Sequence, residues 1–246
     1  PTLIALPGLA IRPAEARHTE YSPYGFQSNG GALSRVAGLA EGVVRVQDEG
    51  SQLAVVALTG AFPIQPNERW LDLCAGPGGK TALLAAIAVL VRRSLAPFGD
   101  SITVTVRDGR ELCSEIPNAF DRILVDAPCT GLGSLRRRPE SRWRKSRDDL
   151  VDLVPLQREL LVAAIGSLTI GGVVAYVTCS PLAEETVDVV TAALAECPDA
   201  EALDTSTILS AVVPSLINAQ RGRAVQLYPH HHHTDAMFIQ LIRRTR

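Results

Sequence analysis

A glycine-rich turn between a short apolar strand and a helix is the feature that most constrains the fold of this chain. Residues 70–73 are typical of a buried strand, and the turn that follows is Cys74-Ala75-Gly76-Pro77-Gly78-Gly79. A helix is predicted from Lys80 to about residue 91. Glycines let the backbone approach a ligand closely, and the N–H groups of the helix N-terminus face that ligand. The pattern predicts a cradle for an anion or a cofactor.

Strands and helices alternate after this turn. The predicted elements are a helix at 148–168 and strands at 102–106, 122–125, 173–177, 225–228 and 237–242. The last two strands are expected to form an antiparallel pair. The alternation predicts an α/β fold with a doubly wound, mainly parallel sheet and an antiparallel closing strand.

Ser180-Pro181 has the sequence of a helix cap followed by a proline at the first helical position. It predicts a helix that runs to about residue 196, with Glu184 and Glu185 in its first turn.

The first 45 residues differ from the rest because they are rich in Gly, Pro and Ala and show weak periodicity. We expect a small N-terminal arm or subdomain at 1–45 and a single catalytic domain at 46–246. At the junction, residues 43–46 predict a strand, and Asp48 can cap a helix at 51–58.

Composition excludes several classes of protein. The 24 Lys and Arg residues against 26 Asp and Glu residues argue against a wholly basic nucleic-acid binder. No apolar run reaches the ~18 residues of a membrane-spanning helix. The five cysteines include no C-x-x-C pair, which argues against a disulfide framework and a zinc site. A soluble, cytoplasmic protein without a bound metal is expected.

The glycine-rich turn alone leaves two interpretations open. Residues 76–81 resemble the end of a phosphate-binding P-loop, G-x-x-x-x-G-K-[ST], which favours a nucleotide hydrolase. The first glycine of that motif is replaced by Cys74. A different nucleotide-type cofactor is therefore an equally good interpretation of the turn.

Two cysteines distinguish these interpretations. Cys129 and Cys179 each follow a predicted strand, and the carboxyl ends of strands line the ligand crevice of a doubly wound sheet. Thiols in that position have no role in phosphate hydrolysis. Cys113 and Cys197 lack such surroundings and are expected to be small buried side chains.

Around these cysteines the sequence resembles the Sun/Nop family of RNA (cytosine-5) methyltransferases, especially the bacterial branch that modifies small-subunit ribosomal RNA. Four blocks carry the resemblance: Val46–Leu53 (VQDEGSQL), Asp72–Thr81 (DLCAGPGGKT), Asp126–Gly131 (DAPCTG) and Thr178–Ser180 (TCS). The resemblance implies a class I, Rossmann-like methyltransferase fold and S-adenosylmethionine as the methyl donor. It also implies RNA as the partner, with 16S ribosomal RNA favoured and transfer RNA as an alternative.

The resemblance implies a role for each matching residue. Cys179 is the expected nucleophile, Cys129 assists product release, and Asp126 lies between the cofactor and N3 of the target base. Asp108 is expected to bind the adenine amine. The methionine and ribose part of the cofactor is expected to be wrapped by Cys74, Ala75, Gly76, Pro77, Gly78, Gly79 and Lys80.

The implied chemistry explains why these groups are needed. Carbon 5 of cytosine becomes nucleophilic when a thiolate adds to carbon 6. An acid at N3, which Asp126 can supply if burial raises its pKa, then lowers the barrier. A lowered pKa is expected for Cys179, aided by helix N-termini that follow both cysteines.

A basic segment follows the Cys129 block and predicts RNA contact through phosphates and a stacking surface. Its candidate residues are Arg136, Arg137, Arg138, Arg142, Trp143, Arg144 and Lys145.

A catalytically inactive RNA-binding module of the same fold is the non-enzyme alternative. His230–His233 matches a Pro-His-rich block of the family and is expected to be native, with metal binding a minor alternative.

The chain departs from the family in two places. The NusB-type helical domain of the bacterial branch is absent from this sequence. Only twenty residues, 82–101, separate the turn from the strand at 102–106, which is too few for a helix, a strand and a second helix. We expect a missing segment near 86–93, with residues 82–88 ending one helix and 92–98 ending another.

Overall fold

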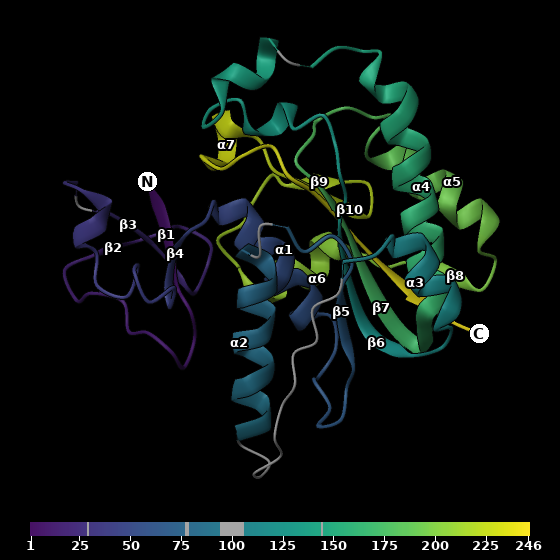
Figure 1. Ribbon diagram of the computed structural model, residues 1–246, viewed down its shortest axis with the longest axis horizontal. Helices are drawn as coiled ribbons and strands as arrows, with labels where there is room; N and C mark the ends of the chain where they lie inside the picture. The colour runs from purple at the N-terminus through teal and green to yellow at the C-terminus, as the bar shows by residue number, and fades with distance from the viewer. Residues whose placement is uncertain (29, 77–78, 94–105, 144) are drawn as a thin grey trace.

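The computed structural model describes residues 1–28, 30–76, 79–93, 106–143 and 145–246. Two sheets organise the chain, and the smaller one is formed by its N-terminal part (Figure 1). Within the described residues, no helix combines the length and the apolar character needed to cross a bilayer.

The N-terminal sheet has the order β2-β3-β1-β4, and its neighbouring strands are antiparallel. Its strands are β1 (Thr2–Ala5), β2 (Arg17–His18), β3 (Gly25–Gln27) and β4 (Val44–Val46). Leu3, Phe26 and Val44 form a small core of its own. The sheet extends to Val46, so its last strand crosses the boundary expected at residue 45.

The main sheet has the order β5-β6-β7-β11-β10-β9, with β8 also paired to β11. Its strands are β5 (Trp70–Asp72), β6 (Phe120–Asp126), β7 (Leu168–Thr178), β8 (Ala200–Ala202), β9 (Gln220–Arg221), β10 (Ala224–Gln226) and β11 (Phe238–Arg244). β5, β6 and β7 are parallel, and β11 joins β7 antiparallel. The expected α/β class with an antiparallel closing strand is confirmed.

Helices cover both faces of the main sheet (Figure 1). They are α1 (Glu49–Gly60), α2 (Gly79–Arg93), α3 (Gly109–Glu115), α4 (Asp149–Ser167), α5 (Val187–Glu196) and α6 (Thr205–Val212). Successive side chains of β7 point to opposite faces of the sheet and pack into two different cores. Ala175 and Val177 join a core with α1, α2 and α6, whereas Val174 and Tyr176 join a second core with α4 and α5.

Two helix predictions are wrong. The helix expected directly after Ser180-Pro181 begins only at Val187, because residues 181–186 form turns that direct the Glu185 side chain into the interior. Residues 82–93 belong to the single helix α2 instead of to the ends of two helices, since no glycine or proline interrupts them. Residues 94–98 of the second expected helix end lie outside the described residues. The predicted strand at 102–106 falls outside the described residues except for Val106.

A buried arginine joins β6 to the end of α1. The Arg122 side chain is 2% exposed and forms an ion pair with Glu68, with Nε 2.7 Å from Oε2. Its guanidinium also donates to the carbonyl oxygens of Leu58, in the last turn of α1, and of Phe62, just beyond the helix. The last carbonyl groups of a helix have no partner within the helix, so Arg122 supplies one. Arg122 therefore ties β6 to Glu68 and to the segment at the end of α1.

We expect Arg122→Leu to lower the free energy of unfolding by about 3–5 kcal/mol, because it removes the cation that neutralises the Glu68 carboxylate and leaves two carbonyl groups without their donor. Urea unfolding followed by circular dichroism measures this. Arg158 makes an exposed ion pair with Glu196 at 3.4 Å, so Arg158→Leu is the control, with an expected loss under about 1 kcal/mol. Equal losses in the two variants would contradict the role of Arg122.

Candidate active site

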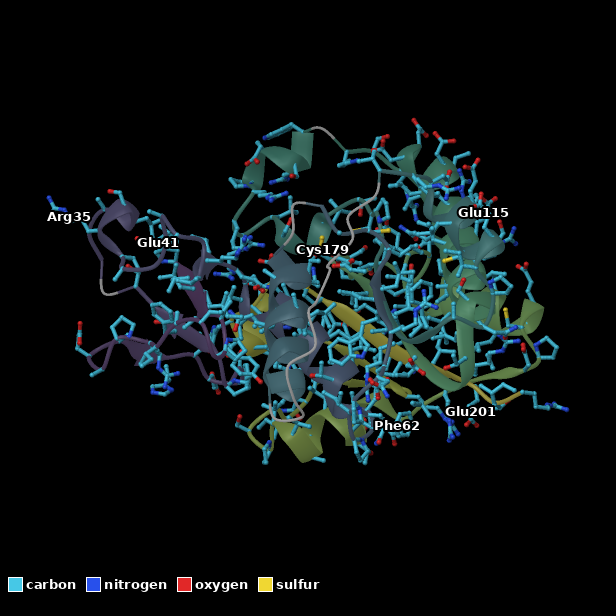
Figure 2. The ribbon with its side chains drawn as sticks, turned by 60° about the horizontal axis from the view of Figure 1, so that its bottom comes forward. Arg35, Glu41, Phe62, Glu115, Cys179 and Glu201 are labelled. Atoms are coloured by element: carbon cyan, nitrogen blue, oxygen red, sulfur yellow. The ribbon has the colours of Figure 1, made fainter. Side chains whose placement is uncertain are left out.

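The parallel pairing of β6 with β7 brings two separate sequence blocks together. Asp126 is in register with Val177, and the Ala127 amide donates to the Val177 carbonyl oxygen at 2.9 Å. The chain therefore leaves both strands at the same edge of the sheet, with Cys129 and Cys179 just beyond it. Figure 2 shows Cys179 near the middle of the molecule, whereas the labelled Arg35, Glu115 and Glu201 lie at its periphery.

The two thiols are in direct contact. The Sγ atoms of Cys129 and Cys179 lie 3.5 Å apart, and neither cysteine forms a disulfide. A hydrogen bond from Cys129 lowers the pKa of Cys179, aided by Lys80 and opposed by burial. The same hydrogen bond, burial and the nearby Glu185 carboxylate raise the pKa of Cys129. The opposite shifts favour ionisation of Cys179 before Cys129, with Cys129 as the hydrogen-bond donor of the pair.

The lowered pKa of Cys179 was expected, but its expected cause was wrong. No helix begins directly after Cys179, since α5 starts at Val187. Cys129 is followed by the short 3-10 turn η2 (Leu132–Ser134). The hydrogen bond from the second thiol takes the place of a helix N-terminus.

A buried glutamate holds the loop that carries Cys129. Glu185 is fully buried, and its carboxylate accepts from the Thr130 amide at 2.7 Å and from the Thr130 hydroxyl at 2.6 Å. Gln157 of α4 donates to the same carboxylate at 3.1 Å and to the Pro128 carbonyl oxygen at 2.8 Å. Glu185 was predicted in the first turn of a helix, and its role depends on a partner 55 residues away.

Close backbone contact fixes the other end of this loop. The Gly133 amide donates to the Cys179 carbonyl oxygen at 2.9 Å, and the Gly133 carbonyl accepts from the Ala236 amide at 2.8 Å. A Cβ atom at Gly133 would lie 2.1 Å from the Ala236 oxygen. Only glycine permits this approach, so the loop after Cys129 lies directly on the backbone of Cys179.

The described part of the glycine-rich turn lies beside the thiols. Lys80, the second residue of α2, forms an ion pair with Asp126 at 2.6 Å. Thr81 donates to Asp72 at 2.6 Å. Burial and the neighbouring Asp72 raise the pKa of Cys74 to about 12, so this thiol stays neutral. Pro77 and Gly78 lie outside the described residues.

Asp108 lies close to the end of β5. It caps α3, and the Gly109 that follows it would bring an added Cβ within 2.8 Å of Leu73. The Arg110 guanidinium pairs with the Asp108 carboxylate at 2.5 Å, and these hydrogen bonds lower the pKa of Asp108 to about 2. Arg110 therefore holds Asp108 as an anion, a pair that was not predicted.

The described candidate residues of the basic segment are all exposed, but two of its arginines are also paired with buried carboxylates. Arg136 binds Asp48 at 2.9 Å, and Arg137 forms a bidentate pair with Asp235. Both carboxylates are buried, and Asp48 also caps α1 as predicted. The remaining described candidates are solvent-exposed: Arg138, Arg142, Trp143 and Lys145. Arg144 lies outside the described residues.

The histidine block is part of the fold. Pro229–His232 forms the short helix α7, and the buried His232 ring accepts from the Tyr228 amide at 3.0 Å. Burial lowers the pKa of His232. In the described part of the chain, no three His, Cys, Asp or Glu side chains are grouped as metal ligands.

We expect iodoacetamide to label Cys179 before Cys129, with a pH midpoint for Cys179 below the ~8.5 of a free thiol. Cys129→Ala removes the hydrogen-bond donor and should raise this midpoint, whereas Cys129→Ser keeps a donor and should raise it less. Peptide mass spectrometry across a pH series measures both. An unchanged midpoint in Cys129→Ala would disprove the coupling.

This chain is similar in sequence to proteins described as methyltransferases. A Mycobacterium tuberculosis protein described as a methyltransferase is 46% identical over 239 residues, covering 91% of this chain and 51% of the relative. Ribosomal RNA small subunit methyltransferase B of Salmonella typhi is 40% identical over 188 residues, covering 69% of this chain and 42% of the relative. The chain thus spans about half the length, or less, of these relatives.

Solved structures show the same fold. A methyltransferase homologue from Pyrococcus horikoshii has a TM-score of 0.75 at 23% identity, covering 99% of this chain and 86% of that one. NSun6 from Pyrococcus horikoshii, solved with SFG, has a TM-score of 0.68 at 22% identity, covering 88% of this chain and 57% of that one. A family model described as 16S rRNA methyltransferase RsmB/F matches residues 89–243. This chain therefore belongs to the RsmB/F family of methyltransferases.

Proposed function

We propose that this protein transfers a methyl group from S-adenosylmethionine to carbon 5 of a cytosine in RNA, with 16S ribosomal RNA as the favoured substrate. The observation that carries the proposal is the contact between two thiols whose pKa values are shifted in opposite directions. The family match and the ribosomal RNA methyltransferases among the relatives support RNA as the substrate. A cytoplasmic location suits that substrate.

The described residues fit the proposed cofactor. Among the described residues beyond its chain neighbours, no atom lies within 4 Å of a Cβ added at Gly76. The buried Asp72 Oδ1 and both polar atoms of the Gln47 amide have no hydrogen-bond partner within the described structure. The turn at 74–80 and Asp108 are proposed to hold the cofactor, which supplies a methyl group activated on a sulfonium.

The first step assigned to the chain is attack by Cys179. Its thiolate forms a bond to carbon 6 of cytosine, and the electron pair of the C5–C6 double bond makes carbon 5 nucleophilic toward the methyl group. Asp126 is proposed to lie at N3 of the ring. Lys80, hydrogen-bonded to Asp126, orients that carboxyl group.

Release of the product requires a base. Once carbon 5 carries the methyl group, its proton must leave, and the C6–S bond then breaks to return Cys179 as a thiolate. The charge and hydrogen bonding of the Cys179 thiolate are what chiefly raise the pKa of Cys129. Because the covalent bond removes that charge, Cys129 can lose its proton more easily in the intermediate and is proposed to act as the base or to assist it.

The exposed residues of the basic segment other than Arg136 and Arg137 are proposed to bind RNA. The Trp143 ring is 84% exposed, with the Arg142 guanidinium 5.5 Å from its centre. An exposed ring with adjacent cations suits an unpaired base and its phosphate. Arg136 and Arg137 are proposed to position the segment, because their ion pairs with buried carboxylates occupy them.

The alternatives are less well supported. The methyltransferase family match counts against a P-loop nucleotidase. An inactive RNA-binding module would have no use for a coupled pair of thiols with a buried carboxylate behind it.

We expect Cys129→Ala to accumulate RNA covalently bound to Cys179, visible as a denaturant-resistant, slowly migrating band. Cys179→Ala should abolish both methyl transfer and the band. The assay uses 16S ribosomal RNA and tritiated S-adenosylmethionine. A band that forms in Cys179→Ala would reverse the two roles, and full activity of that variant would refute the covalent mechanism.

Substitution of the arginines proposed to bind RNA should weaken RNA binding, whereas substitution of an arginine paired with a buried carboxylate should lower stability. We expect Arg138→Gln and Arg142→Gln each to reduce the salt dependence of binding to a 16S RNA fragment by roughly 0.7 in the log–log slope, the value for one phosphate contact. Arg137→Gln should instead lower the melting temperature, because it leaves the Asp235 carboxylate buried without its partner. Fluorescence anisotropy measures the salt dependence of RNA binding, and thermal unfolding measures the melting temperature. If all three variants changed both quantities alike, the separate roles of Arg137 and of Arg138 and Arg142 would be contradicted.

A further inference from the structure

Gln47 is a buried side chain with no partner of its own. It is 6% exposed, and neither its Nε2 nor its Oε1 makes a hydrogen bond within the described structure. Buried amides are almost always hydrogen-bonded, because an unpaired one loses its bonds to water without replacement. The orphaned amide of Gln47 therefore suggests a ligand.

The backbone of Gln47 is firmly held. Its amide donates to the Thr2 carbonyl oxygen at 3.2 Å, and its carbonyl accepts from Gln52 Nε2 at 3.1 Å. The residue thus joins β4 to the start of α1, and Asp48 beside it caps that helix. These contacts fix where the side chain begins, and its burial limits the positions that the amide can take.

The amide lies against the start of α2. A Cβ added at Gly79, the first residue of this 15-residue helix, would lie 3.9 Å from Gln47 Cδ and 4.0 Å from Nε2. Free N–H groups and the helix dipole favour an anion at this end. No acidic side chain occupies the first turn of α2, and Lys80 is paired with Asp126.

The chemistry of this position matches one part of the proposed cofactor. The amino-acid end of S-adenosylmethionine carries a carboxylate and an ammonium group. A primary amide has an N–H donor for the carboxylate and a carbonyl acceptor for the ammonium group. We propose that Gln47 binds the amino-acid end of S-adenosylmethionine, with Nε2 donating to the carboxylate beside the N-terminus of α2 and Oε1 accepting from the ammonium.

This inference rests on the proposed cofactor, and two ligands separate the two claims. S-adenosylhomocysteine carries the amino-acid end, whereas 5′-methylthioadenosine has the same nucleoside and sulfur without it. We expect Gln47→Met to weaken S-adenosylhomocysteine binding roughly tenfold or more, the effect of losing hydrogen bonds to charged groups. Binding of 5′-methylthioadenosine should change less than about twofold, and calorimetry measures both.

Two further variants sharpen the test. Gln47→Glu keeps the shape and should weaken S-adenosylhomocysteine by repulsion of its carboxylate, again sparing 5′-methylthioadenosine. Gln65 is exposed, so Gln65→Met is a control that should leave both affinities unchanged. Gln47→Met should not lower the melting temperature of the ligand-free protein, since the side chain makes no hydrogen bond there.

The outcomes are distinct. If the wild-type protein binds neither ligand, the cofactor proposal itself fails. If it binds both and Gln47→Met weakens both equally, or neither, the assignment of Gln47 is overturned. A loss of RNA affinity with unchanged S-adenosylhomocysteine affinity would assign Gln47 to the RNA instead and would equally overturn the proposal.

Discussion

The contact between the Cys129 and Cys179 thiols depends on the parallel pairing of β6 with β7. The register that sets Asp126 beside Val177 brings the two loops out of the sheet together, and their sulfur atoms then lie 3.5 Å apart. At that distance the hydrogen bond between the thiols lowers the pKa of Cys179 and raises that of Cys129. A slip of the register would separate the sulfur atoms and return both thiols toward ordinary behaviour.

Remote parts of the chain hold this pair in place. Glu185 and Gln157 fix the start of the Cys129 loop from one side of the sheet. Gly133 lies on the Cys179 backbone and joins it to Ala236. Arg136 and Arg137 then connect the same loop to Asp48, at the junction with the N-terminal sheet, and to Asp235. The site is therefore a product of the whole fold, with the N-terminal sheet tied to it through the start of α1.

Local patterns predicted the fold well, because strand alternation, glycine turns and helix caps depend on neighbouring residues. The Asp48 cap, β6, β7, α4 and the antiparallel pair of β10 and β11 were all predicted. Long-range pairing could not be predicted, since Arg137 meets Asp235 across 98 residues and Thr130 meets Glu185 across 55. For the same reason the helix expected after Pro181 was wrong: nothing local shows that Glu185 turns inward.

The claim that Cys179 forms the covalent bond to cytosine is central to this account. Its most direct test uses 16S ribosomal RNA transcribed with 5-fluorocytidine, because fluorine at carbon 5 cannot leave as a proton and the enzyme stays attached after methyl transfer. Digestion and mass spectrometry of the complex should find one nucleotide adduct, on the peptide that contains Cys179 and not on the one that contains Cys129. An adduct on Cys129, or methyl transfer to ordinary RNA without any adduct on the fluorinated RNA, would contradict the account.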